Sequence, residues 1–142
     1  MEFTQGVRFD ALGLTEEVQR ALKKRNIEES TPVQAGCIPP MREWKDVIAK
    51  APTGTGKTFA FGIPIIEHIE PGSEETEAVI LAPTRELAMQ ITEELRDLCV
   101  YLPGVRIVCL YGGAPIGKQI DALKKHPQIV VATPGRLSDH MK

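Results

Sequence analysis

The chain has 142 residues, of which 42% are hydrophobic and 25% charged, a composition that supports one ordinary globular domain with its own core. Its formal net charge is -2, from 17 basic and 19 acidic side chains. Bulk positive charge therefore cannot hold this chain on nucleic acid, and any such contact has to be local and geometrically specific.

Cysteines, histidines and apolar runs exclude several other classes of protein. The three cysteines are widely spaced, contain no CxxC pair and favour a reducing compartment. The three histidines lack metal-ligand spacing. The longest apolar run, 59–66, is too short for a membrane span, and the N-terminus has no apolar signal segment. We therefore expect a soluble cytoplasmic protein that does not bind a membrane.

Two helices are predicted near the N-terminus. The first carries Leu14, Val18, Ala21 and Leu22 on one face, with Thr15 placed as its cap. The second is expected over 31–44, with a threonine cap followed by proline at the first helical position. A short apolar strand at 46–51 then runs into a Gly-rich turn, and a helix is expected to begin near residue 57.

The rest of the chain alternates between apolar strands and amphipathic helices. The predicted strands are 78–82, 105–111 and 128–132, and a helix follows each of them. The first of these helices carries Leu87, Ile91, Leu95 and Leu98 on one face, the second covers 115–125, and the third begins at 133. One polar, acidic segment, 71–77, is typical of a linker. Near-continuous apolar strands between helices predict an α/β fold, a mostly parallel sheet with helices on both faces.

The strongest motif is a phosphate-binding loop between a predicted strand and a predicted helix. Its Gly-rich backbone can wrap a phosphate with N–H groups, and the helix N-terminus favours the same anion. Lys57 can neutralise the β and γ phosphates as the catalytic cation, and the Thr58 hydroxyl suits Mg²⁺. The alternative is a turn that merely joins strand to helix. The predicted nucleotide contacts are Ala51, Pro52, Thr53, Gly54, Thr55, Gly56, Lys57 and Thr58.

Several segments, in order along the chain, resemble the motifs of DEAD-box RNA helicases of superfamily 2. The loop resembles that family's first motif, 83–88 its PTRELA motif, Gly112-Gly113 its GG motif, and 133–136 its TPGR motif. Upstream, 26–34 resembles the Q motif. The resemblance implies an N-terminal RecA-like P-loop NTPase domain, with 1–35 as the Q-motif region and 46–142 as the α/β core. It also implies an enzyme that couples ATP binding and hydrolysis to local unwinding of RNA duplexes.

The resemblance assigns adenine recognition to the Q-motif region. Gln34 would read the adenine edge with its amide, and the isolated aromatic Phe9 would stack on the base. Where the family carries a Gly-aromatic pair, this chain has Asn26-Ile27, so Ile27 can offer apolar contact without stacking. From the residues alone, Gln34 is more simply explained as the partner of Thr31 in a helix-capping box, and Phe9 as a core aromatic.

The resemblance also assigns an RNA track to the carboxyl ends of the parallel strands, where open α/β sheets bind ligands. Small residues, free N–H groups and two separate arginines there would contact phosphates and 2′-OH groups without reading bases. Each segment taken alone is more simply explained as a capped helix start. The residues concerned are Pro83, Thr84, Arg85, Glu86, Gly112, Gly113, Thr133, Pro134, Gly135 and Arg136.

The family's DEAD motif is expected a few tens of residues beyond the TPGR segment, and these 142 residues contain no Asp-Glu pair. We therefore expect a partial domain, incomplete at the C-terminal end of its sheet, that hydrolyses ATP negligibly and can self-associate through an exposed sheet edge. We also expect no N-terminal targeting extension. The alternatives are a P-loop NTPase that does not act on nucleic acid and a non-catalytic nucleotide- or RNA-binding module.

Overall fold

The computed structural model describes residues 8, 12–27, 30, 32–43 and 57–141. They belong to two compact units, which we describe separately. The first is drawn from Met1–His68 and Asp97–Tyr101, and the second from Ile69–Arg96 and Leu102–Lys142. The predicted strand at 46–51 lies outside the described residues.

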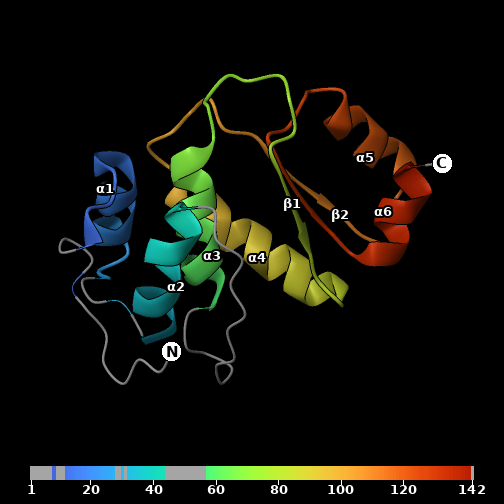
Figure 1. The fold of residues 1–142 in the computed structure, drawn as a ribbon. Helices are drawn as coiled ribbons and strands as arrows, with labels where there is room; N and C mark the ends of the chain where they lie inside the picture. Colours follow the sequence, from blue (N-terminus) through green and yellow to red (C-terminus); the bar gives the residue numbers. More distant parts are fainter. Residues whose placement is uncertain (1–7, 9–11, 28–29, 31, 44–56, 142) are drawn as a thin grey trace. The chain divides into compact units, whose positions relative to one another are not determined.

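The first unit contains α1 (Glu16–Lys24), α2 (Pro32–Arg42) and α3 (Lys57–His68) (Figure 1). α2 packs against α3. The predicted face of α1 is confirmed, because Val18, Ala21 and Leu22 are buried. Ile38 of α2 and several apolar side chains of α3 are also buried. α1 therefore buries the apolar face that its sequence periodicity predicts.

The two ends of α1 differ in how their backbone groups are satisfied. Thr15 is the N-cap residue, but its side chain makes no capping hydrogen bond, so the predicted side-chain cap is wrong in that respect. At the other end, Asn26 N–H donates to Lys23 O (2.9 Å) and Ile27 N–H to Leu22 O (3.0 Å). Asn26 has a φ of 59°. These are the bonds of a Schellman motif, which stops α1 and sets the position of Ile27.

Asn26→Gly is expected to raise the free energy of unfolding by about 0.5–1 kcal/mol, because glycine adopts a left-handed conformation without the steric cost of a β-carbon. Asn26→Ala is the matched control and is expected to lower it by about 1 kcal/mol. Urea midpoints of the three proteins measure both effects. Equal midpoints for the glycine and alanine variants would contradict the capping role.

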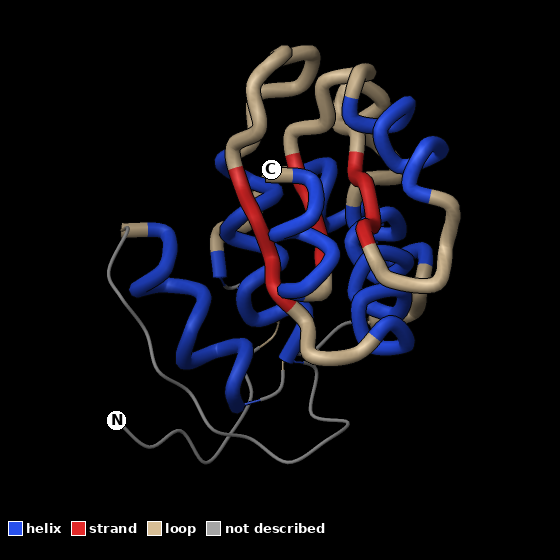
Figure 2. Tube along the Cα trace, turned by 90° about the vertical axis from the view of Figure 1, so that its right-hand side faces the viewer, coloured by secondary structure: helices blue, strands red, loops and turns tan. Residues whose placement is uncertain are grey.

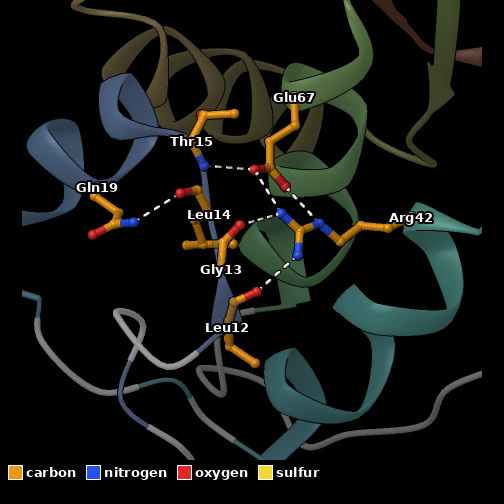
Figure 3. A network of polar contacts seen from close by, with 7 residues as sticks. All are labelled: Leu12, Gly13, Leu14, Thr15, Gln19, Arg42 and Glu67. Atoms are coloured by element: carbon orange, nitrogen blue, oxygen red, sulfur yellow. Dashed lines mark hydrogen bonds and ion pairs between the residues drawn. The ribbon is translucent and has the colours of Figure 1, made fainter.

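A charged network joins α2, α3 and the segment before α1 (Figure 3). Arg42 donates from Nε to Glu67 Oε1 (3.1 Å) and from Nη2 to Glu67 Oε2 (3.0 Å). The same guanidinium donates to the carbonyls of Leu12 and Gly13, both at 2.7 Å. Glu67 Oε2 also accepts from Thr15 N–H at 2.8 Å. This bidentate pair fixes the last turns of α2 and α3 to each other.

The second unit is built on a parallel three-stranded sheet, as predicted for the α/β fold. Its strands are β1 (Ala78–Leu81), β2 (Ile107–Leu110) and β3 (Ile129–Ala132), in the order β1-β3-β2 (Figure 2). Both neighbouring pairs are parallel. The connecting helices are α4 (Arg85–Leu98), α5 (Ile116–Leu123) and α6 (Pro134–His140). The last residues of α4 belong to the first unit.

Helices lie on both faces of this sheet, with α5 and α6 opposite α4 (Figures 1 and 2). On one face, Leu123 of α5 and Leu137 of α6 pack against a core of Leu110, Val130 and Ala132. The register places Val79 and Leu81 of β1 on the same face as Val130 and Ala132, yet they are 53% and 57% exposed. The predicted arrangement of helices on both faces is confirmed, and on this face α5 and α6 pack on β2 and β3 and leave the two side chains of β1 exposed.

The acidic segment 71–77 is anchored to the second unit, so its interpretation as a linker is wrong. Gly72 N–H donates to Gly104 O at 2.9 Å, and the Thr76 hydroxyl donates to Pro127 O at 2.8 Å. The two backbones approach so closely that a β-carbon at Gly104 would lie 2.9 Å from Gly72 N. Only glycine permits this contact.

Gln128 is the polar centre of this region and is fully buried at the start of β3. Its Oε1 accepts from Arg106 N–H at 2.7 Å. Its Nε2 donates to Ser73 O (2.8 Å) and Gly104 O (3.0 Å). The Gln128 side chain thus bonds the start of β3 to two distant segments, one at Ser73 and one at 104–106.

Candidate functional site

The nucleotide half of the predicted site lies in the first unit. α3 begins at Lys57, as predicted, and Thr58 is half-buried in its first turn. Residues 51–56 and Phe9 lie outside the described residues, as does the side chain of Lys57. The described part of the phosphate-binding segment is therefore the helix that follows the Gly-rich sequence.

Two predicted adenine contacts can be located. Gln34 is buried on α2, which packs against α3. Ile27 is half-buried directly after the Schellman turn of α1. The capping-box alternative for Gln34 remains open, because its partner Thr31 lies outside the described residues. The Arg42–Glu67 pair at the far ends of α2 and α3 restrains the helix carrying Gln34 against the helix that begins at Lys57.

The RNA half of the predicted site lies in the second unit, at the carboxyl edge of the sheet. Leu81, Ala132 and Leu110 end their strands in register with one another. The ladder continues beyond them, with Ala82 N–H donating to Ala132 O (2.9 Å) and Thr133 N–H to Leu110 O (3.0 Å). The three predicted segments therefore leave the sheet at one edge, as expected for a parallel sheet.

Arg85 brings two of these segments together. Its side chain is 53% exposed, and its guanidinium carbon lies 5.8 Å from the centroid of the Tyr111 ring. Gly113, with a φ of +90°, is so close that a β-carbon there would lie 3.6 Å from Arg85 Nη1. Arg85 Nε is 3.8 Å from the carboxylate of exposed Glu86, a weak pair in water. Arg85 is thus an accessible cation beside the Gly112-Gly113 loop.

The two threonines of the edge differ. Thr84 Oγ1 accepts from Leu87 N–H at 3.2 Å, so this hydroxyl caps α4. Thr133 is the N-cap residue of α6, with proline at the first helical position, but its side chain makes no capping bond. Thr84 therefore caps a helix with its side chain, as the helix-start interpretation predicts. Thr133 occupies the N-cap position of its helix, but its side chain does not take part in capping.

Arg136 differs from Arg85 in pointing into the protein. Its side chain is only 13% exposed. Its Nη1 donates to Ala114 O (3.1 Å) and to Gln119 Oε1 (3.2 Å). Its Nε is buried and makes no hydrogen bond in the described part of the chain, although Asp139 Oδ2 lies 3.7 Å away.

Sequence reasoning missed Gln119 and Tyr111 as members of this edge. Gln119 lies in a predicted amphipathic helix, where a glutamine is expected on the solvent side. The only signal for Tyr111 was its position immediately before Gly112-Gly113. Both are found through partners that only the folded chain supplies.

The described residues present no cluster of metal ligands, and two of their cysteines are buried. The described residues contain no group of three or more His, Cys, Asp or Glu side chains that could hold a metal. Burial raises the pKa of the Cys99 thiol to about 12 and also raises that of Cys37, so both stay protonated at neutral pH. Within 12–27, 32–43 and 57–141, every helix is too short or too polar to cross a membrane.

The fold and site define a RecA-like domain of the P-loop type. The features that define it are the parallel sheet with its helices, the helix that follows the Gly-rich motif, and the three segments at the carboxyl edge of the sheet. The chain belongs to the DEAD/DEAH box helicase family, whose sequence model matches residues 31–142. The resemblance seen in the motifs is thereby confirmed.

Curated relatives extend the likeness over nearly the whole chain. It is 50% identical over 133 residues to the DEAD-box ATP-dependent RNA helicase CshA of Geobacillus kaustophilus, covering 94% of this chain and 28% of the relative. It is also 50% identical to the ATP-dependent RNA helicase CshA of Limosilactobacillus reuteri, and the match covers 95% of this chain and 27% of the relative. The chain thus spans roughly a quarter of the length of these relatives.

Solved structures share the fold. A DEAD box protein from Methanococcus jannaschii matches with a TM-score of 0.85 and 38% identity, over 99% of this chain and 38% of that one. A hypothetical ATP-dependent RNA helicase from Sulfolobus tokodaii matches with a TM-score of 0.81 and 37% identity, over 90% and 36%. These matches confirm the predicted RecA-like α/β fold.

Proposed function

We propose that this chain is the ATP-binding and RNA-backbone-binding N-terminal part of a DEAD-box RNA helicase. In the longer protein, ATP binding and hydrolysis would be coupled to local unwinding of RNA duplexes. The relatives, RNA helicases of which the chain covers 28% and 27%, support this proposal. For the 142 residues alone we propose binding with negligible hydrolysis, because they contain no Asp-Glu pair to position metal and water.

The observation that carries the proposal is the shared edge of the sheet. Three segments leave it side by side, with exposed Arg85 beside the Gly112-Gly113 loop. Backbone N–H groups, small residues and one accessible cation suit successive phosphates of a single strand. No base-reading group is required, so RNA would be bound without sequence preference. This local arrangement explains how a chain of net charge -2 can hold RNA.

The nucleotide half is proposed to hold ATP with Mg²⁺. α3 begins at Lys57, directly after the Gly-rich sequence, so its unpaired N–H groups and positive dipole end suit an anionic phosphate. Lys57 would hold the phosphates and Thr58 the magnesium, while Gln34, Phe9 and Ile27 would contact adenine. A bound Mg²⁺ supplies charge neutralisation for the phosphates.

The two alternatives make different predictions about these segments. A P-loop NTPase unrelated to nucleic acid would leave Thr84–Glu86, Gly112-Gly113 and Thr133–Arg136 undisturbed by RNA. A non-catalytic module would bind nucleotide or RNA, and its longer parent would show no RNA-dependent ATP turnover. The exposed position of Arg85 beside Gly113 favours the RNA-binding proposal over the first alternative.

The proposal also includes a cytoplasmic location. It further assigns one family domain to the whole chain, with 1–35 as the Q-motif region and 46–142 as the α/β core. Self-association of the 142-residue chain belongs to it as well. β1 is an outer strand of the described sheet and its Val79 and Leu81 side chains are exposed on one face, which supports association there.

RNA binding can be tested by titrating the 142-residue chain with a ten-nucleotide oligouridylate and following backbone amides by NMR. The amides of 84–86, 112–113, 133 and 135–136 are expected to shift. Arg85→Gln is expected to weaken binding about 3- to 10-fold and to reduce the slope of log K against log salt by about 0.7, because one phosphate contact is lost.

The matched control is Arg20→Gln. Arg20 is likewise an exposed arginine over a tyrosine ring, 4.2 Å from the centroid of Tyr101, but it lies on α1 in the first unit. It is expected to leave both affinity and salt slope unchanged. Equal losses for the two arginines, or shifts spread evenly over both units, would contradict a track at the strand edge.

A further inference from the structure

Gln119 is a buried polar side chain in the middle of α5, and the proposed function gives it no role. It is only 6% exposed, whereas its neighbours Ile116 and Ile120 on the same helix are 42% and 41% exposed. A helix that buries a glutamine and exposes two isoleucines has a specific use for the glutamine, since burying an amide requires matched partners.

The partners of Gln119 satisfy both ends of its amide. Nε2 donates to Tyr111 O at 3.0 Å. Oε1 accepts from Arg136 Nη1 at 3.2 Å and lies 3.0 Å from His140 Nε2. Because an amide oxygen only accepts, this ring nitrogen of His140 carries the proton. Gln119 thus bonds α6 on one side and, on the other, the backbone immediately before Gly112.

Arg136 closes the same loop from its other end. Its Nη1 also donates to Ala114 O at 3.1 Å, directly after Gly113. The carbonyls on both sides of Gly112-Gly113 are therefore held, Tyr111 by Gln119 and Ala114 by Arg136. With its side chain 13% exposed and Nη1 shared between two acceptors, Arg136 is far less accessible than Arg85 at 53%.

We infer that Gln119 is a positioning residue that, together with Arg136, holds the Gly112-Gly113 loop at a fixed distance from the start of α6. Arg136 serves RNA binding by placing this loop, and Arg85 is the arginine that contacts phosphate. The inference rests on the proposed RNA-binding function and adds to it a buried clamp between two of its segments.

The salt dependence of RNA affinity separates contact from positioning. Each phosphate contact contributes about 0.7 to the slope for a single strand. Arg136→Gln is expected to weaken binding of the oligouridylate about 3- to 10-fold with the slope unchanged, unlike Arg85→Gln. Gln119→Met, which preserves shape and removes all three hydrogen bonds of the amide, is expected to weaken it by a similar factor.

A double-mutant cycle tests whether Gln119 and Arg136 act as one device. The Gln119→Met/Arg136→Gln protein is expected to bind no more weakly than the weaker single variant, because each change already releases the loop. Gln90→Met, on an exposed glutamine of α4, is the matched control and is expected to leave affinity unchanged. Circular dichroism at the assay temperature verifies that all variants are folded, so a loss of affinity is not a loss of fold.

Three outcomes overturn the inference while the wild-type chain binds RNA. They are a reduced salt slope for Arg136→Gln, additive losses in the cycle, and unchanged affinity in Gln119→Met. If the wild-type chain fails to bind RNA, the proposed function fails for this chain, and amide hydrogen exchange still decides the clamp. Faster exchange at Gly112 and Gly113 in Gln119→Met supports it, and unchanged exchange overturns it.

Discussion

Lys57→Ala is expected to lower the affinity of the chain for Mg²⁺-ADP by roughly 10- to 150-fold. Lys57 opens α3 directly after the Gly-rich sequence, where the helix N-terminus already favours an anion. Its ammonium adds a charge-assisted hydrogen bond to phosphate, worth about 1.5–3 kcal/mol. Alanine keeps the helix and removes only this interaction, because alanine is the best helix former.

The measurement is titration of a fluorescent ADP analogue with Mg²⁺ on both proteins. Lys118→Ala is the matched control, since Lys118 is an exposed lysine of α5 that we place in no site. ADP is expected to displace the analogue better than GDP, as adenine recognition by Gln34 requires. Equal affinity of the wild-type and Lys57→Ala proteins would contradict the phosphate-loop assignment.

Gln128→Met is expected to lower the free energy of unfolding by about 2–6 kcal/mol. The change leaves Arg106 N–H without its acceptor and removes two donated bonds, to Ser73 O and Gly104 O. An orphaned buried donor costs about 1–3 kcal/mol, and each lost bond adds about 0.5–1.5 kcal/mol. Methionine preserves the unbranched shape, so creation of a cavity contributes little.

Urea unfolding measures the loss. Gln90→Met, at an exposed position of α4, is the control, and its free energy of unfolding is expected to change by no more than about 0.5 kcal/mol. Amide exchange gives a local readout. The Arg106 amide is expected to exchange faster in Gln128→Met, because its acceptor is gone. A Gln128→Met protein as stable as Gln90→Met would show that the buried amide is not a structural centre.

The elements of the second unit could be predicted because each depends on local pattern. Short apolar runs predict the strands at 78–82 and 128–132. The helical spacing of Leu87, Ile91 and Leu95 predicts the helix between them. The structure trims the strands to β1 and β3, and it places α4 over Arg85–Leu98. Exposure of Val79 and Leu81 was not predictable, since the periodicity of a strand does not reveal which neighbours cover it.

The sequence by itself determined the family, the parallel α/β fold and the single edge at which three motif segments gather. It could do so because turn residues, caps and apolar runs act over a few positions, and parallel strands must end on one side. Only the tertiary structure decided which polar side chains are buried. Gln128 meets Ser73 across 55 positions, and Gln119 meets Arg136 across 17. A buried amide or guanidinium is stable only where such distant partners converge, and no local pattern records that convergence.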